Sequence, residues 1–544
     1  MRLTRRTRLA GVALVAAGSL VLAACGGGDE GGESTDAVIT NFGTEPQNPL
    51  IPQSTNETGG GRAIDLLFAG LVSYQKDGSS VNEVAESIES EDNVTWTVTL
   101  KDWSFSDGSP VTAQSFVDAW NFGAYAPNAQ LNSYFFYPIE GFDEAQAEEN
   151  PTPEMSGLEV VDEKTFTIKL KQAEADFPAR LGYSAFYPLP ESAFAEDGTV
   201  TDEFGENPVG NGPYMLDGEG AWEHDVQIAM VPNEEYEGAR EPKNGGITLK
   251  FFNSPDTAYT AVQTGDLDVL DAVPPSALST YQDDDSVQSF AEPGSVFGSI
   301  TIPESAPGFG ANEEGNLRRQ AISRAINREE ITENIFDGTR TPASDFSAPV
   351  MPGFTEEIEG NEVLEFDADE AKDLWAQANE IAEYEGPFTL SYNSDGAGNK
   401  EWVDAVVNQI KNNLEIDAEA NAYATFAEFR TDITNRDLDT AFRTGWQPDY
   451  PSIYNYLAPL YGTGAGSNDG DYSNEEFDAL MEAISGEQDE ETRYELQAEA
   501  QAILMEDLPA IPLWYSNIAA VASTNVDNVE FNWQNQPELH LITK

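Results

Sequence analysis

The chain has 544 residues, of which 97 are acidic and 27 basic, and its formal net charge is −70 at pH 7. So acidic a chain repels nucleic acid, which excludes that partner, and its charge either favours cationic or zwitterionic ligands or only keeps the protein soluble. A single cysteine and two histidines argue against disulfides, a histidine metal site and a Ser-His-Asp triad, and no metal, cofactor or catalytic residue is expected.

The first 37 residues have the features of an export and anchoring segment. Four arginines precede an uncharged, mostly apolar stretch from Leu9 to Ala24, which is too short to span a membrane. Residues 1–24 are therefore predicted to be a signal peptide. Cys25 resembles the acylated cysteine of a bacterial lipobox, and a plain signal peptide with a chance cysteine is the alternative. Residues 25–37 would then be a lipidated flexible tether at the outer face of the cytoplasmic membrane.

Alternation of apolar and polar residues predicts two half-buried strands. Residues 94–100 place Trp96 and Val98 on the same face of a strand. Residues 165–170 repeat the pattern, and we expect both strands to contribute one face to a core.

Capping residues indicate where several helices begin. Thr112 precedes an apolar helical face that ends at Gly123. Asn327 and Ser473 each stand three residues before a glutamate, which is the capping-box spacing. A further helix is predicted over residues 495–507. Helices interleaved with strands indicate an α/β fold.

Seven segments of the chain, in order, resemble blocks of the family 5 extracellular solute-binding proteins, the peptide-binding subunits of ABC importers. The most recognisable is a strand followed by Ser-Asp-Gly-Ser-Pro-Val-Thr-Ala, and another is the Gly-Asn-Gly-Pro-Tyr turn. Each block alone is weak, whereas seven in the right order span essentially the whole chain after the tether. The segments lie at residues 43–72, 100–113, 208–214, 261–268, 317–328, 446–480 and 506–512.

The resemblance implies a two-lobed periplasmic-binding-protein-like fold with a hinge, in which the first lobe is split into two subdomains. Domain I of the first lobe would comprise residues 38–72, 205–300 and 513–544. Domain II, inserted into it, would comprise residues 73–204. The second lobe, domain III, would comprise residues 301–512.

The resemblance also implies a binding protein and not an enzyme. Members hold an extended peptide between the lobes and deliver it to ABC permease subunits, which work with separate ATPase subunits. We expect a monomer that reaches the membrane only through its lipid anchor. Two alternatives remain: the same fold binding an oligosaccharide or another small solute, and a surface-anchored hydrolase that uses two carboxylates.

The family places a carboxylate for the ligand's α-amine after a Gly-Trp pair, and Gly445-Trp446-Gln447-Pro448-Asp449 matches that position. Asp449 is therefore predicted to bind the ligand amine, with a surface-turn acid as the alternative. Trp446 and Gln447 would present the strand that pairs with the ligand, a mode called β-augmentation. Trp446 could instead belong to the core.

The remaining candidate residues are also carried over from the resemblance. Asn56, Glu57 and Thr58 match the opposite ligand-pairing segment, or form an ordinary loop. Arg443 matches a position that can neutralise the ligand carboxylate, or makes a structural salt bridge. Tyr134 belongs to an aromatic run that would wall the cleft or pack in a core.

Overall fold

The computed structural model describes residues 36–544, apart from residues 253, 395–397 and 425. The predicted signal peptide (1–24) and Cys25 lie outside the described residues. In the part that the structure describes, no helix is long and apolar enough to cross a membrane.

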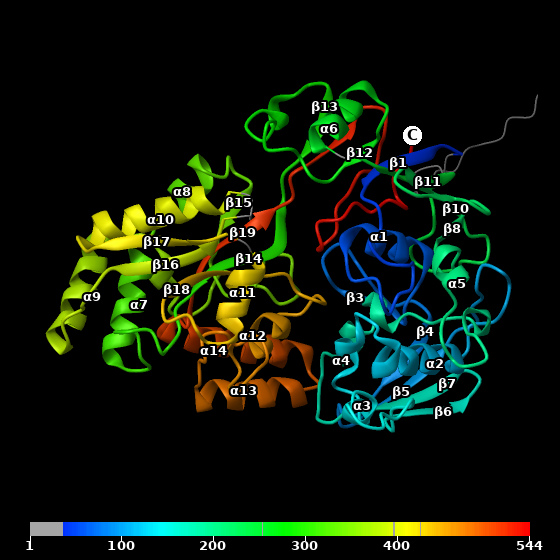
Figure 1. The fold of residues 1–544 in the computed structure, drawn as a ribbon, viewed down its shortest axis with the longest axis horizontal. Helices are drawn as coiled ribbons and strands as arrows, with labels where there is room; N and C mark the ends of the chain where they lie inside the picture. The colour runs from blue at the N-terminus through cyan, green and yellow to red at the C-terminus, as the bar shows by residue number, and fades with distance from the viewer. Residues whose placement is uncertain (1–35, 253, 395–397, 425) are drawn as a thin grey trace, which may run out of the picture. The chain divides into compact units, whose positions relative to one another are not determined.

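The described chain contains an eight-stranded sheet whose strands come from distant parts of the sequence (Figure 1). Their order is β13-β20-β12-β1-β11-β10-β8, and β9 pairs with β10. β1 runs parallel to both of its neighbours, β11 and β12. The strands are β1 (Val38–Gly43), β8 (Tyr214–Leu216), β9 (Trp222–Glu223), β10 (Gln227–Pro232), β11 (Gly246–Phe251), β12 (Val269–Leu270), β13 (Val287–Phe290) and β20 (Ala520–Ser523), accompanied by α1 (Thr58–Leu67) and α6 (Pro255–Thr264).

Between β1 and β8 the chain forms a separate antiparallel sheet of order β4-β5-β7-β6 and the hairpin β2-β3. The two predicted strands are confirmed as β5 and β7, with Trp96 and Val98 buried. The apolar core of this region is continuous with that of the eight-stranded sheet. The elements are β2 (Val72–Tyr74), β3 (Ser80–Asn82), β4 (Ala85–Glu89), β5 (Thr95–Leu100), β6 (Leu158–Asp162), β7 (Thr165–Lys169), α2 (Ala113–Ala124), α3 (Phe142–Ala145), α4 (Phe177–Arg180) and α5 (Asp202–Glu206).

A six-stranded sheet of order β15-β19-β14-β18-β16-β17 organises the second half of the chain. Helices α7, α9 and α10 pack on it through a shared apolar core (Figure 1). The strands are β14 (Pro293–Thr301), β15 (Arg340–Pro342), β16 (Phe388–Asn393), β17 (Ala418–Tyr423), β18 (Ala441–Trp446) and β19 (Ala510–Asn517). The helices are α7 (Glu313–Arg324), α8 (Arg328–Asn334), α9 (Ala368–Ile381), α10 (Asn399–Leu414), α11 (Phe426–Thr434), α12 (Tyr454–Tyr461), α13 (Glu475–Gly486) and α14 (Glu490–Asp507).

Two connections join the two large sheets in the part of the chain that the structure describes. β14 and β19 pair with each other in the six-stranded sheet, so the chain crosses between the two large sheets at residues 291–292 and 518–519. The predicted crossings were near 300 and 513. The two crossings lie side by side, because the N–H of Ile518 donates to the carbonyl of Glu292 at 2.7 Å.

Capping residues located some helices correctly and others a few residues away. Thr112 caps α2 and Asn327 caps α8, as predicted. The prediction that Ser473 caps α13 is wrong. Asn474 is the cap, because its Oδ1 accepts from the N–H groups of Glu476 and Phe477 at 2.9 and 3.1 Å. α14 begins at Glu490 instead of 495, since Asp489 caps it.

The Gly-Asn-Gly turn locks the return from the inserted region onto α1. Asn211 exchanges two hydrogen bonds with the main chain of Ala69, both of 3.0 Å. A Cβ at Gly210 would stand 1.9 Å from the carbonyl oxygen of Leu67, which is backbone and cannot move alone.

We therefore expect Gly210→Ala to lower the free energy of unfolding by about 2–4 kcal/mol, because backbone must shift to relieve the overlap. Urea unfolding measures this. Gly466→Ala is the matched control, since nothing lies within 4 Å of its Cβ position, and equal stabilities of the two variants would contradict the packing argument.

His224 stands in the turn after β9 between two carboxylates. Its Nδ1 lies 2.8 Å from Glu45 Oε1 and its Nε2 lies 3.0 Å from Glu206 Oε2. The hydrogen bond to Glu45, followed by the contacts with Glu206, raises the pKa of the imidazole. The doubly protonated imidazolium can donate to both carboxylates, so the fold favours that form over the neutral ring.

A group whose pKa is raised on folding stabilises the protein below its unfolded value, about 6.5 for histidine. We expect wild type to be more stable than His224→Gln at pH 5.5. That advantage should be lost as the pH rises through the raised folded-state pKa. Urea unfolding at pH 5.5 and pH 9 tests this, and an advantage that is identical at both values would refute it.

Candidate functional site

Five of the predicted site residues line a single cavity of about 350 Å³, here called the Asp449 cavity. They are Asn56, Glu57, Thr58, Gln447 and Asp449. The first three precede or begin α1, and the other two follow β18, so the cavity joins segments almost four hundred residues apart. Its wall is completed by Tyr74, Tyr183 and residues 532–540 near the C-terminus.

The Asp449 side chain is half-buried and held in one orientation. Asn455 Nδ2 donates to its Oδ2 at 3.2 Å, and Asn455 Oδ1 accepts from the Asp449 N–H at 3.1 Å and from Trp446 Nε1 at 3.0 Å. Burial raises the pKa of Asp449, while the Asn455 bond and the more distant Arg180 oppose that rise. Within the described residues, no basic nitrogen lies within 4.0 Å of this carboxylate. The site therefore offers a partly desolvated carboxylate that forms no direct ion pair among the described residues, although Arg62 and Arg240 line the same cavity.

Glu57 serves the fold before any ligand. Its carboxylate caps α1 by accepting from the N–H groups of Gly59 and Gly60 at 2.8 and 3.0 Å. The neighbouring Asn56 and Thr58 are exposed, and in the described chain the main-chain groups of Asn56 make no backbone hydrogen bond. What this segment offers to a ligand is therefore main chain and short side chains.

The strand β18 has one edge that is mostly unpaired. It pairs with β14 from Phe442 to Trp446, but with β16 only at Ala441 and Phe442. Beyond Phe442 the second edge has no strand beside it among the described residues. An open strand edge can accept an extended chain through main-chain hydrogen bonds.

Tyr134 is 53% exposed, so it does not belong to the core. Its ring lies 4.3 Å from that of Phe135, which stacks on Tyr183 at 4.0 Å. Burial of its hydroxyl and the charge of Asp449 raise the pKa of Tyr134 to about 12. The same two causes contribute to the raised pKa of Tyr183 and of Tyr74. Tyr74 and Tyr183 line the Asp449 cavity, whereas Tyr134 is not part of its lining.

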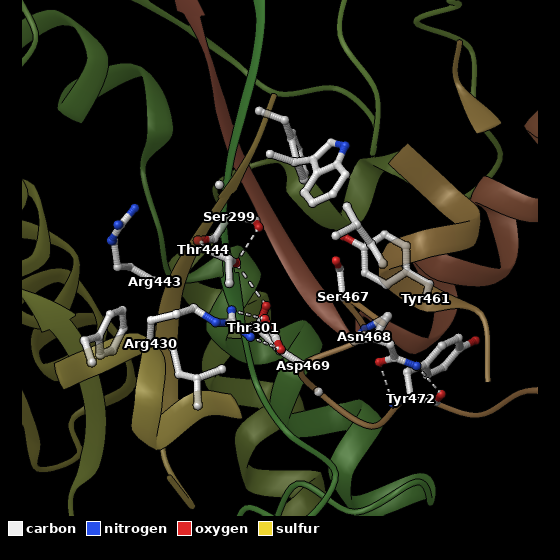
Figure 2. Close-up of a pocket in the computed structure, with 18 of the residues that line it drawn as sticks. Ser299, Thr301, Arg430, Arg443, Thr444, Tyr461, Ser467, Asn468, Asp469 and Tyr472 are labelled. Carbon is white, nitrogen blue, oxygen red and sulfur yellow. Dashed lines mark hydrogen bonds and ion pairs between the residues drawn. The ribbon is translucent and has the colours of Figure 1, made fainter. Parts of the chain in front are cut away.

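Arg443 and Trp446 line a different cavity of about 400 Å³, here called the Thr444 cavity (Figure 2). It lies among β14, β18, α11, α12 and residues 467–472. Arg443 Nε donates to Asn393 Oδ1 at 2.8 Å, and its guanidinium lies 5.7 Å from the centre of the Phe426 ring. Trp446 is half-buried at the border of the core that contains Tyr456. The residues predicted to form one cleft are therefore divided between two neighbouring cavities.

Sequence reasoning missed several groups around Asp449. Tyr74, Tyr183 and Asp65 line its cavity, and burial raises the pKa of Asp65 to about 6 despite nearby Arg240. None of them stands in a recognisable motif. Only the folded chain brings them to Asp449.

The comparisons with known proteins agree with this architecture. The family model described as "Bacterial extracellular solute-binding proteins, family 5 Middle" matches residues 80–468. The chain is 28% identical over 530 residues to the oligopeptide-binding protein OppA of Bacillus subtilis (strain 168), covering 94% of each chain. It is 29% identical over 467 residues to the periplasmic murein peptide-binding protein MppA of Escherichia coli (strain K12), covering 84% of this chain and 83% of that one.

A solved structure has the same fold. The unliganded open form of the murein tripeptide-binding protein MppA superimposes with a TM-score of 0.80 at 23% identity, over 94% of this chain and 97% of that one. The predicted two-lobed, periplasmic-binding-protein-like α/β fold is thereby confirmed. The family consists of binding proteins, which agrees with the expectation that the chain is not an enzyme. Because its model matches well over half of the sequence, the chain belongs to the bacterial extracellular solute-binding proteins of family 5.

Proposed function

We propose that this protein is the substrate-binding component of an ABC importer and captures extended peptides that have a free amino terminus. The observation that carries the proposal is the half-buried carboxylate of Asp449, which forms no ion pair with any described residue and lies beside an open strand edge. Relatives named as oligopeptide-binding proteins share nearly the whole length of the chain, which supports a peptide ligand.

In this proposal the ligand amine pairs with Asp449 and its main chain lies along β18. Trp446 and Gln447 extend that strand toward Asp449, and the main chain of Asn56 to Thr58 faces it. Tyr134 walls the approach. Arg443, beside the open edge, is the candidate for the ligand carboxylate.

The membrane and partner assignments belong to the same proposal. Residues 1–24 direct export, Cys25 carries the lipid, and residues 25–37 tether a monomer that delivers peptide to the permease. Cys25→Ser is expected to release the protein into the medium, because no acyl chains then hold it. Fractionation of cells tests this, and retention in the membrane fraction would contradict the anchor.

We also propose that the two large sheets are the centres of domains I and III and that residues 291–292 and 518–519 are the hinge between them. The two crossings are the shortest chain segments that connect the sheets, and they are hydrogen-bonded to each other. Motion at only these positions would open the Asp449 cavity, and hydrogen exchange with and without ligand measures it. Equal exchange at the crossings in both states would argue against the hinge.

Thermal unfolding with ligand pools separates the candidate ligands. A ligand at 100 times its dissociation constant adds about 2.7 kcal/mol to stability. We expect tetra- and pentapeptide pools to raise the melting temperature, and oligosaccharide pools and N-acetylated peptides to leave it unchanged. Stabilisation by sugars alone would show that the same fold serves another solute.

A further inference from the structure

The floor of the Thr444 cavity is a row of three hydroxyl groups (Figure 2). Thr444 Oγ1 lies 2.8 Å from Ser299 Oγ and 2.9 Å from Thr301 Oγ1, and it also donates to the carbonyl of Ser299 at 3.3 Å. β14 and β18 hold these residues in register, with Ser299 directly opposite Thr444.

Each hydroxyl of this row has one proton and two acceptor sites. Either oxygen can be the donor in the Ser299–Thr444 pair and in the Thr301–Thr444 pair, and Thr444 can also donate to the carbonyl of Ser299. When Thr444 donates to that carbonyl, Ser299 and Thr301 both donate to Thr444, and lone pairs on Ser299 Oγ and Thr301 Oγ1 remain. In that arrangement the floor of the cavity is a hydrogen-bond acceptor.

The charges of the cavity neutralise one another. Arg430 binds Asp469 through both Nη atoms, each at 2.6 Å (Figure 2). Arg436, which is not part of the lining, lies 3.5 Å from the same carboxylate. Arg443 also lines the cavity, but its side chain leaves the opposite face of β18 from the Thr444 hydroxyl, and its Nε donates to Asn393 Oδ1. A charged ligand group on the hydroxyl floor would be desolvated without a counter-charge, which is unfavourable.

The walls suit a planar ring. Six aromatic side chains line the cavity, and a volume of about 400 Å³ accommodates a large side chain. Aromatic rings pack edge-to-face and gain more than their buried area alone provides. The aromatic residues are Phe297, Phe426, Phe429, Trp446, Tyr461 and Tyr472.

We propose that the Thr444 cavity selects one side chain of the bound peptide, an uncharged aromatic ring with a hydrogen-bond donor, and that tyrosine is preferred to phenylalanine. The proposal rests on the proposed function, because β18, along whose edge the peptide would lie, contributes residues 443–446 to the lining of the cavity. It adds that Thr301 and Ser299 determine specificity at that position.

Calorimetry with a tetra-alanine panel tests the preference. One alanine at a time is replaced by tyrosine, phenylalanine, lysine or glutamate, and each peptide is titrated into the full-length processed protein. At one position we expect tyrosine to bind about three- to tenfold more tightly than phenylalanine, the range of one neutral hydrogen bond. Lysine and glutamate there should bind at least about tenfold more weakly than tyrosine.

Thr301→Val removes one acceptor at nearly constant shape. The tyrosine-to-phenylalanine ratio should fall toward one, and thermal unfolding of the unliganded variant reports whether the fold is intact. Thr440→Val is the matched control, because Thr440 pairs with Ser391 at 2.9 Å in the same sheet but does not line the cavity. It should keep the wild-type ratio.

Equal affinity for tyrosine and phenylalanine at every position, or an unchanged ratio in Thr301→Val, overturns this inference and leaves peptide binding standing. If no peptide of the panel binds, the proposed function itself fails and the inference falls with it.

Discussion

Replacing Asp449 with asparagine is expected to weaken the binding of a free-amine peptide by about 100-fold or more and to leave the fold intact. The substitution keeps the contact with Asn455 but removes the charge that would meet the ligand's ammonium group. Removal of one partner from a desolvated charge pair costs roughly 3–5 kcal/mol, because the other charge stays buried and unpaired. Calorimetry with an unmodified tetrapeptide measures the effect.

Two controls isolate the charge pair. N-acetylation of the peptide should weaken binding to wild type to a similar degree and should have little further effect on Asp449→Asn. Asp65→Asn changes a second carboxylate of the same cavity, one that already has Tyr187 and Arg240 nearby, and should have a small effect. Equal affinity of wild type and Asp449→Asn would remove the basis of the proposed function.

Arg328→Met is expected to lower the free energy of unfolding by roughly 3–5 kcal/mol. The guanidinium is buried, and burial lowers its pKa to about 9. It donates to the carbonyls of Pro512, Ser323 and Leu364 at 2.8, 3.1 and 2.5 Å, and so joins β19, α7 and the segment before α9. Methionine fills the space but removes the donor from the carbonyls of Pro512 and Leu364, whereas the Ser323 carbonyl keeps the N–H of Ala325. A buried carbonyl that loses its partner costs roughly 1–3 kcal/mol.

Urea unfolding measures this loss, and Arg324→Met is the control. Arg324 is half-buried on α7, four positions before Arg328, and its replacement should change the stability by less than about 0.5 kcal/mol. A similar small change in Arg328→Met would mean that the carbonyls find water or other donors.

Local patterns predicted what depends on neighbours in sequence. Alternation gave the buried face of β5, and short polar side chains located the starts of α2 and α8. Ser473 misled because the asparagine after it reaches two N–H groups, a competition that spacing alone does not resolve. The pairing of β14 with β19, which places the connections between the large sheets at residues 291–292 and 518–519, leaves no local pattern in the sequence.

The candidate site was only partly accessible to such reasoning. Asp449 was identified because a short motif precedes it, and its surroundings remained hidden. Tyr74 and Tyr183 reach it from residues hundreds of positions away, so no local pattern marks them. Glu57 was predicted as a ligand contact and does line the cavity. Its role as the cap of α1, where it accepts from the N–H groups of Gly59 and Gly60, was not predicted.

The first sheet has a consequence for how the chain is made. β12 lies between β1 and β20, and β13 pairs only with β20 among the described strands. The sheet is therefore complete only when β1, which begins at Val38, and β20, which begins at Ala520, are both in place. Contacts so distant in sequence form slowly. A chain still being threaded out of the cell therefore keeps this sheet unfinished. A chain that ends before residue 520 lacks β20, so the edges of β12 and β13 that pair with it stay exposed and can aggregate with other chains.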